Sequence, residues 1–322
     1  MNTPGGTTGE PPTASQRPLV SVVVPTRGRP ALLLETLASI VDQDYPGPME
    51  VFVVHDREAV DGSLAELSRP DRRVVPIVNS RTGGLCGARN TGVLASHGIF
   101  VASCDDDDLW HPTKVRLQVD RLLADPELLA VGAGIRLLMG KRGIVDWPAR
   151  DEVVPRERLL RNRVKELHSS TLMMGRNAFE VAGLYDEHLP HGYGEDYDWL
   201  LRASRVGRVG AVPVILADIR KDVPSWFRDR SLNTADALEY LLGKHPDLRR
   251  DRRGHARVLG QIAYALATAG RRRTALGVVG RALRRDPVAP HVWLALVAVV
   301  AGPRIEPQRM LAAARLVGRG LS

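Results

Sequence analysis

Four consecutive aspartates, Asp105 to Asp108, are the residues whose type and spacing most directly indicate chemistry. Carboxylates this close repel one another, which raises their pKa values unless a positive charge neutralises them. Mg²⁺ or Mn²⁺ would do so, because hard divalent cations bind carboxylate oxygens and leave coordination positions for water and substrate phosphates. The run therefore indicates a metal site that can stabilise a diphosphate leaving group. The alternative is a solvated acidic loop in which Asp108 caps the helix that follows Trp110.

The segments that must position this run alternate between strand and helix patterns. Short β-branched runs predict buried strands, and apolar residues at helical spacing predict helices between them. The predicted strands are residues 19–24, 50–56, 74–78 and 99–103, and the predicted helices are residues 30–41 and 88–96. This alternation predicts an α/β fold with a mostly parallel, Rossmann-like sheet flanked by helices. Ligands bind at the carboxyl ends of the strands in such sheets, and both Asp56 and the acidic run directly follow a strand.

The rest of the chain divides into a mixed region and a purely helical one. After Trp110 we expect helices at 113–123, 177–181 and 197–206, and strands at 128–139, 143–147, 172–174 and 208–216. From Ser231 onward only helices are predicted, at 233–242, 258–269, 273–284, 291–301 and 307–317. We therefore predict a disordered segment rich in Pro, Gly, Ser and Thr at 1–17, an α/β domain at 18–230 and an all-α extension at 231–322.

The composition and charge limit the classes of protein that fit. The chain has 322 residues, 44% of them hydrophobic, and only two cysteines. It shows no signal peptide and no run of the roughly 18–20 apolar residues that a membrane span needs, so a cytoplasmic location is expected. Residues 231–322 hold 16 basic and 6 acidic residues, a net charge of +10. Such a surface indicates an anionic partner, for instance the inner face of a membrane, or a solvated arginine-rich face.

Several further motifs occur in a fixed order around the acidic run, and together they resemble those of the family-2 glycosyltransferases of the GT-A fold. The matching segments are Val20–Thr26, Gln43–Pro46, Asn79 with Gly83–Gly84, Ala88–Gly92, Asp105–Trp110, Gly183–Glu187 and Gly194–Asp198. The resemblance spans about 200 residues, from Ser21 to Asp222. It implies an enzyme that transfers a sugar from a nucleotide diphosphate, with Mn²⁺ or Mg²⁺, to a hydroxyl acceptor, and that inverts the anomeric configuration.

The resemblance also implies roles on the donor side. Pro25, Thr26 and Arg27 would line the nucleotide pocket, and Asp56 would bind the base. Arg89 would face the donor. Asp105 would contact the ribose or the metal, with Asp106 next to Asp105 on the donor side. Asp107 would be the direct metal ligand. The sequence departs from the family at His55-Asp56-Arg57-Glu58, where Asp-Asp-Gly-Ser is usual. Uridine is the favoured base, and guanosine and thymidine stay open.

On the acceptor side the resemblance makes Asp196 the catalytic base, since inverting transfer needs a carboxylate to take the acceptor proton. Glu195, Trp199 and His168 are expected to lie near the acceptor. The alternatives are that Glu195 and Asp196 cap a helix, that Trp199 is a buried core residue and that His168 is structural. The family often has a histidine after the last strand that completes the metal shell. This chain has none in register there, so Arg220, Lys221 or Asp222 would take over part of that role.

Other classes of protein fit the sequence less well. A sugar-nucleotide nucleotidyltransferase would need a glycine-rich phosphate loop with a lysine, whereas the turn from Pro25 to Pro30 has two prolines. A dinucleotide oxidoreductase would need G-x-G-x-x-G after a strand, and no strand is followed by it. A non-catalytic nucleotide-sugar-binding module remains an alternative. Nucleic acid is disfavoured because the basic third has few aromatics. The acceptor stays open between a lipid-linked sugar, a polysaccharide and a small molecule.

Overall fold

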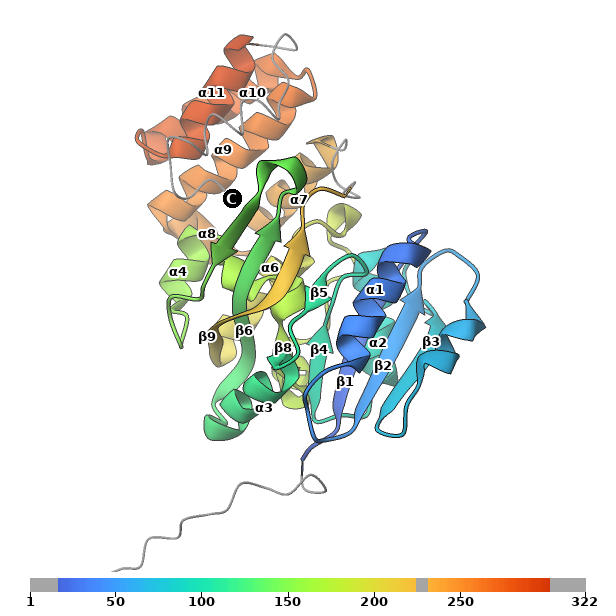
Figure 1. Ribbon diagram of the computed structural model, residues 1–322. Coiled ribbons are helices and arrows are strands. Elements are labelled where there is room, and N and C mark those ends of the chain that lie inside the picture. The colour runs from blue at the N-terminus through green and yellow to red at the C-terminus, as the bar shows by residue number, and fades with distance from the viewer. Residues whose placement is uncertain (1–16, 224–230, 302–322) are drawn as a thin grey trace, which may run out of the picture.

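The computed structural model describes residues 17–223 and 231–301, which form one mixed sheet with helices on both faces (Figure 1). Within those residues the sheet has nine strands in the order β3-β2-β1-β4-β8-β6-β9-β5, with β7 paired to β6. The strands are β1 Val20–Thr26, β2 Met49–His55, β3 Arg72–Val78, β4 Phe100–Ser103, β5 Leu109–Trp110, β6 Leu128–Leu138, β7 Ile144–Trp147, β8 Met173–Gly175 and β9 Arg208–Arg220.

The first four strands are all parallel, and both faces of β1, β2 and β4 are buried. Along β1, Val22 and Val24 face the core under α1, while Val23 faces the core under α2. A strand covered on both sides reads as a continuous apolar run, as the sequence of β1 does. Because these strands run in one direction, the residues that follow β1, β2 and β4 meet at one edge of the sheet.

Beyond β4 the strand directions change. β8 is antiparallel to both β4 and β6, and β6 pairs in parallel with the long β9. β5 adds two residues at the far edge, where Leu109 and Trp110 pair with Asp218 and Ala217. The acidic run therefore lies between β4 and β5, and β9 returns beside it.

The helices cover the sheet and then continue as a stack of their own. In Figure 1 the orange and red helices α9, α10 and α11 pack together at one end of the molecule, away from the blue strands. The helices are α1 Pro30–Val41, α2 Leu85–Ala95, α3 Lys114–Ala124, α4 Arg156–Arg161, α5 Arg176–Ala182, α6 Glu195–Val206, α7 Ser231–Lys244, α8 Pro246–Arg250, α9 Arg252–Thr268, α10 Arg272–Arg285 and α11 Pro290–Ala301. One apolar core holds α6 residues such as Leu200 together with Leu241 of α7 and Ile262 of α9.

The predicted α/β class with a helical C-terminal region is confirmed, and so is the helix at 30–41. The sequence patterns missed β5, the short helices α4 and α8, and the end of β9, which extends to Arg220. The predicted helix at 307–317 lies outside the described residues, as does nearly all of the predicted disordered segment. Among the helices that the structure describes, none combines the length and apolar character that crossing a bilayer requires.

Candidate active site

A cleft of about 1450 Å³ opens at the edge of the sheet where β1, β2 and β4 end. Its walls include the turn after β1, the loop before α2, the acidic run, the segment between β7 and β8, and the start of α6. Nearly all the predicted site residues line this cleft. The exceptions are Arg89, Trp199 and Asp222.

Asp106 ties the acidic run to the turn after β1. Its Oδ2 accepts a hydrogen bond of 2.8 Å from Thr26 Oγ1 and one of 3.4 Å from the backbone N–H of Arg27. Asp106 is buried, and burial raises its pKa to about 6 although the Thr26 bond opposes the rise. This carboxyl therefore positions the turn that carries Pro25, Thr26 and Arg27, because it is hydrogen-bonded to both Thr26 and Arg27.

Arg89 lies beneath the floor of the cleft. Its Nη2 is 2.6 Å from Asp105 Oδ1, and its Nη1 is 3.2 Å from Glu195 Oε1. Only 1% of its side chain is exposed, so the expectation that Arg89 itself faces the donor is not met. The guanidinium instead joins one carboxylate of the acidic run to one carboxylate of α6.

The two carboxyl groups that Arg89 joins differ in their pKa. Burial acts to raise the pKa of Asp105, but the charges of Arg89, His168 and Lys221 and the hydrogen bond from Ser169 together outweigh it, so the pKa is lowered. Burial, opposed by Arg89 and reinforced by the neighbouring charge of Asp196, raises the pKa of Glu195 to about 7. The acidic run therefore keeps one firmly ionised carboxylate at Asp105, whereas Glu195 changes its charge near neutral pH.

Asp107 is held by Arg29, which sequence reasoning did not single out. Arg29 Nη1 lies 2.6 Å from Asp107 Oδ2 and 3.3 Å from Asp106 Oδ1. Burial and repulsion from Asp105 nevertheless raise the pKa of Asp107. A carboxylate in this setting is stabilised by any further cation that approaches it.

Asp108 and His168 complete an acidic cluster with Asp105. One ligand atom from each of these three residues lies within 4.8 Å of the other two. Asp108 does not cap the next helix. Its Oδ2 accepts from Ser170 Oγ at 2.5 Å and its Oδ1 from the backbone N–H of Arg220 at 3.0 Å. Burial and repulsion from Asp105 raise the pKa of Asp108 well above its usual range.

The donor set of this cluster fits a divalent cation. Its two carboxylates supply the oxygen ligands that Mn²⁺ and Mg²⁺ prefer, and the imidazole of His168 adds a third ligand atom. Burial lowers the pKa of His168 to about 4, which leaves the ring neutral, as metal ligation requires. His168 was expected near the acceptor, whereas the structure places it beside Asp105 and Asp108, the carboxylates that could bind a metal. Asp107 lies outside this three-residue cluster, so its role as direct ligand stays a prediction.

Asp56, the predicted base-binding residue, follows β2 and lines the cleft beside the loop before α2. Asp56 Oδ1 accepts from Asn79 Nδ2 at 2.8 Å and from the backbone N–H of Gly84 at 2.9 Å. The unusual residues beside it take structural roles. Glu58 accepts from the Gly28 backbone N–H at 2.6 Å, and Arg57 Nη2 donates to the Gly83 carbonyl at 2.9 Å.

Asp196 lies at the first turn of α6 and lines the same cleft as Asp56. Its two oxygens lie 2.8 and 3.1 Å from Arg163 Nη2. Burial acts to raise the pKa of Asp196, but the charges of Arg163, His168 and Arg89 and the hydrogen bond from the Tyr197 backbone together outweigh it, so the pKa is lowered. Helix α6 begins after Gly194, and Asp196 Oδ1 accepts a hydrogen bond of 2.7 Å from the Tyr197 backbone N–H in its first turn. Asp196 therefore satisfies one N–H at the start of the helix, as the alternative expected, and also lines the cleft.

One expectation on the acceptor side, for Trp199, and two at the metal site, for Arg220 and Lys221, need correction or refinement. Trp199 is fully buried, donates from Nε1 to the Gly183 carbonyl at 3.0 Å and packs on Phe179, so it is a core residue and does not face an acceptor. Arg220 Nη2 pairs with Glu35 on α1. Lys221 lines the cleft close to the acidic run, and its charge acts on Asp105, Asp107 and Asp108.

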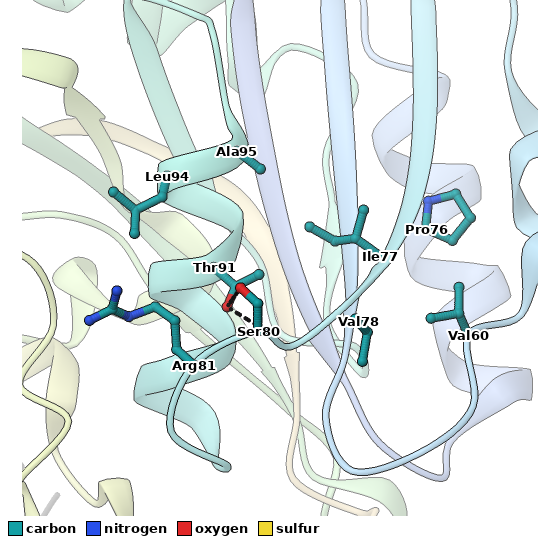
Figure 2. Close-up of a pocket in the computed structure, with 9 residues that line it drawn as sticks. All are labelled: Val60, Pro76, Ile77, Val78, Ser80, Arg81, Thr91, Leu94 and Ala95. Atoms are coloured by element: carbon teal, nitrogen blue, oxygen red, sulfur yellow. Dashed lines mark hydrogen bonds between the residues drawn. The ribbon is translucent and has the colours of Figure 1, made fainter.

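A second, shallower groove of about 650 Å³ lies between β3 and α2, outside the cleft (Figure 2). Figure 2 shows Ile77 and Leu94 on its two sides and Val60 beyond β3. The lining includes one charged residue, Arg81, which is paired with Glu187. Without converging acids or bases, this groove has no means to catalyse group transfer.

The comparisons with known proteins agree with this geometry. The family model described as glycosyl transferase family 2 matches residues 21–180. A glycosyltransferase of Haemophilus influenzae is 27% identical over 214 residues, which is 63% of this chain and 65% of that protein. The chain thus spans slightly less than two thirds of the length of that relative.

Solved structures show the same fold. The S. aureus TarS 1–349 structure in complex with UDP-GlcNAc superimposes with a TM-score of 0.59 at 16% identity, covering 92% of each chain. The mannosyltransferase PcManGT from Pyrobaculum calidifontis, in complex with GDP-Man and Mn²⁺, gives a TM-score of 0.54 at 21% identity, over 95% of this chain and 88% of that one. The fold and the site define a glycosyltransferase of the GT-A type. The chain belongs to glycosyltransferase family 2.

Proposed function

We propose that this enzyme transfers a sugar from a nucleotide diphosphate, with UDP favoured, to a hydroxyl acceptor and inverts the anomeric configuration. The observation that carries the proposal is the arrangement of one cleft. Asp56, the acidic run, Lys221 and Asp196 all line it. In the proposal Asp56 meets the nucleoside, the acidic run and Lys221 meet the diphosphate, and Asp196 meets the acceptor. A UDP-sugar bound to TarS and a GDP-sugar with Mn²⁺ bound to PcManGT support a donor of this class.

Mn²⁺ or Mg²⁺ would be held by Asp105, Asp108 and His168, with Asp107 joining if it leaves Arg29. When bound, the cation supplies positive charge to the departing diphosphate. Lys221 supplies a second positive charge at the same wall of the cleft. Asp56 has one oxygen occupied by Asn79 and Gly84, and its other oxygen is the acceptor for a base N–H.

Asp196 performs the proton transfer in this proposal. The acceptor oxygen forms a bond to the anomeric carbon while the bond from that carbon to the diphosphate oxygen breaks, and its electron pair leaves with the diphosphate. The acceptor proton passes to the Asp196 carboxylate. Attack comes from the face opposite the leaving group, so the configuration inverts. Arg163 must shift from Asp196 before that carboxylate can take the proton.

The test has a binding part and a catalytic part. Calorimetric titration of UDP-, GDP- and dTDP-sugars, with and without Mn²⁺, identifies the donor and its metal dependence. Replacing Asp196 by Asn should leave donor binding intact and slow transfer by roughly 10²- to 10⁴-fold. Asp236→Asn, an exposed carboxylate on α7, is the matched control. Unchanged transfer by the Asp196 variant, or metal-independent binding of every donor, contradicts the proposal.

We also propose that the C-terminal helices contact an anionic membrane, which would place the enzyme at the inner face of that membrane. Seven exposed arginines support this: Arg249, Arg250, Arg252, Arg253, Arg271, Arg272 and Arg273. Helix α11 adds an exposed apolar stripe of Trp293, Val297 and Val300, with 51%, 51% and 77% of each residue exposed. Basic and apolar groups together favour interfacial binding. Failure to float with anionic liposomes at low salt would rule it out.

A further inference from the structure

The wall of the cleft that faces Asp196 is built from one segment, residues 139–169, and its charge has a single sign. The cleft-lining residues of this segment include three basic side chains, Arg142, Arg163 and Lys165, and no aspartate or glutamate. The rest of the lining includes the acidic run and the first residues of α6. A one-signed cationic wall attracts an anion, and the donor diphosphate belongs at the acidic run with the metal.

Arg163 is the member of this wall that touches the catalytic machinery. Its Nη2 donates to both oxygens of the Asp196 carboxylate, at 2.8 and 3.1 Å. Within residues 17–223 and 231–301, its Nε and Nη1 donate to no other group, and 33% of the side chain is exposed. A guanidinium has five N–H donors in a planar fork that matches two phosphate oxygens. Arg163 therefore has a donor edge to offer to a ligand in the cleft.

Lys165 lies on the same wall two residues further on. Its Nζ sits 3.6 Å from the centre of the Trp147 ring, and both residues line the cleft. The indole ring holds the ammonium group by a cation–π contact. Lys165 therefore adds a second positive charge to the wall that carries Arg163.

From this arrangement we infer that the acceptor carries a phosphate ester close to the hydroxyl that is glycosylated, and that Arg163 and Lys165 bind this phosphate. The inference rests on the proposed function and names its acceptor class, a phosphorylated polyol or sugar. An acceptor phosphate on Arg163 draws the guanidinium toward itself. Asp196 is then released beside a hydroxyl of the same molecule, so the base becomes available only when an acceptor is present.

The test uses the full chain with Mn²⁺ and saturating UDP, which blocks the diphosphate position. Titration calorimetry measures binding of sn-glycerol 3-phosphate, with glycerol as the neutral comparison. A second arm uses dihexanoyl phosphatidylglycerol below its critical micelle concentration, which separates a lipid-borne phosphate from a soluble one. We expect binding of at least one phosphate ester and none of glycerol.

Variants assign that binding to the basic wall. Arg163→Gln should weaken phosphate binding roughly tenfold or more, the usual effect of losing a hydrogen bond to a charged group. Lys165→Gln should weaken it without touching Asp196, so it keeps the test valid if Arg163→Gln fails to fold. Arg150→Gln, an exposed arginine of the same segment outside the cleft, should change nothing.

Two results overturn the inference. One is that neither phosphate ester binds. The other is that the Arg163 and Lys165 variants bind as well as the unaltered chain, which would leave Arg163 as a structural counterion of Asp196 alone. If the unaltered chain does not bind UDP with Mn²⁺, the proposed function is contradicted instead. Failure of the inference and failure of the proposed function are therefore distinguishable.

Discussion

Replacing Asp198 by Asn tests how firmly the helical extension holds the helix that carries the proposed base. Asp198 is fully buried two residues after Asp196. Its Oδ1 lies 2.8 Å from His245 Nε2 and 2.8 Å from Lys244 Nζ, and its Oδ2 accepts from Arg202 Nε at 3.0 Å. Two of these three partners belong to the C-terminal region.

The size of the effect follows from the pKa of Asp198. Burial acts to raise it, but the His245 hydrogen bond and the charges of Arg202 and Lys244 lower it to about 2. A fall of about 2 units from the ordinary value near 4 corresponds to about 2.5 kcal/mol of unfolding free energy. Since the folded pKa is the lower one, this stability is complete above about pH 4 and is lost as the pH falls toward 2. We expect Asp198→Asn to lose about 3 kcal/mol at neutral pH, because it also leaves buried cations unpaired.

Urea denaturation followed by tryptophan fluorescence measures this loss. The matched control is Asp247→Asn at the same interface, where the carboxylate pairs with Arg156 and Arg205 but is 29% exposed. Such a partly exposed pair contributes about 1 kcal/mol or less. Equal losses in both variants would refute the reasoning. So would a loss in Asp198→Asn that does not shrink between about pH 4 and pH 2.

Two further predictions concern the donor side. Arg29→Gln removes the cation that pairs with Asp106 and Asp107. It should therefore strengthen Mn²⁺ binding severalfold in calorimetric titration, and weaker binding would mean that Arg29 organises the site and does not compete with the metal. Gly87→Ala places a Cβ 1.8 Å from the Thr82 carbonyl oxygen, so the loop before α2 must move. We expect a higher KM for the donor and a lower melting temperature, and an unaltered KM would show that the loop adapts.

The parts of the fold that the sequence predicts are those specified by local patterns. Helix α1 has Pro30 at its first position and apolar residues at helical spacing, and its bounds are as predicted. The parallel strands are short apolar runs, and the position of Asp56 and the acidic run after them follows from strand direction. These features need no information from distant residues.

The parts that were missed depend on contacts between residues far apart in the chain. Strand β5 has two residues and exists because it pairs with β9. Trp199 shows the same limit, since its place in the core is set by Phe179 and Tyr185. The pairing of Arg163 with Asp196 joins a loop to a helix, and an arginine in an irregular segment carries no local signal. A cationic excess in residues 139–169 was the only sequence feature that could have indicated it.

The core shared by the catalytic helix α6 and the C-terminal helices limits how this enzyme can be recombined. Leu200, Leu241 and Ile262 belong to one continuous apolar cluster. Arg257 of α9 donates to the Tyr197 hydroxyl at 2.9 Å, next to the proposed base. A chimera joined at residue 230 would therefore cut through an interior and not through a linker. Grafted C-terminal helices from another family member should support activity only if α6, or its neighbours, are exchanged with them.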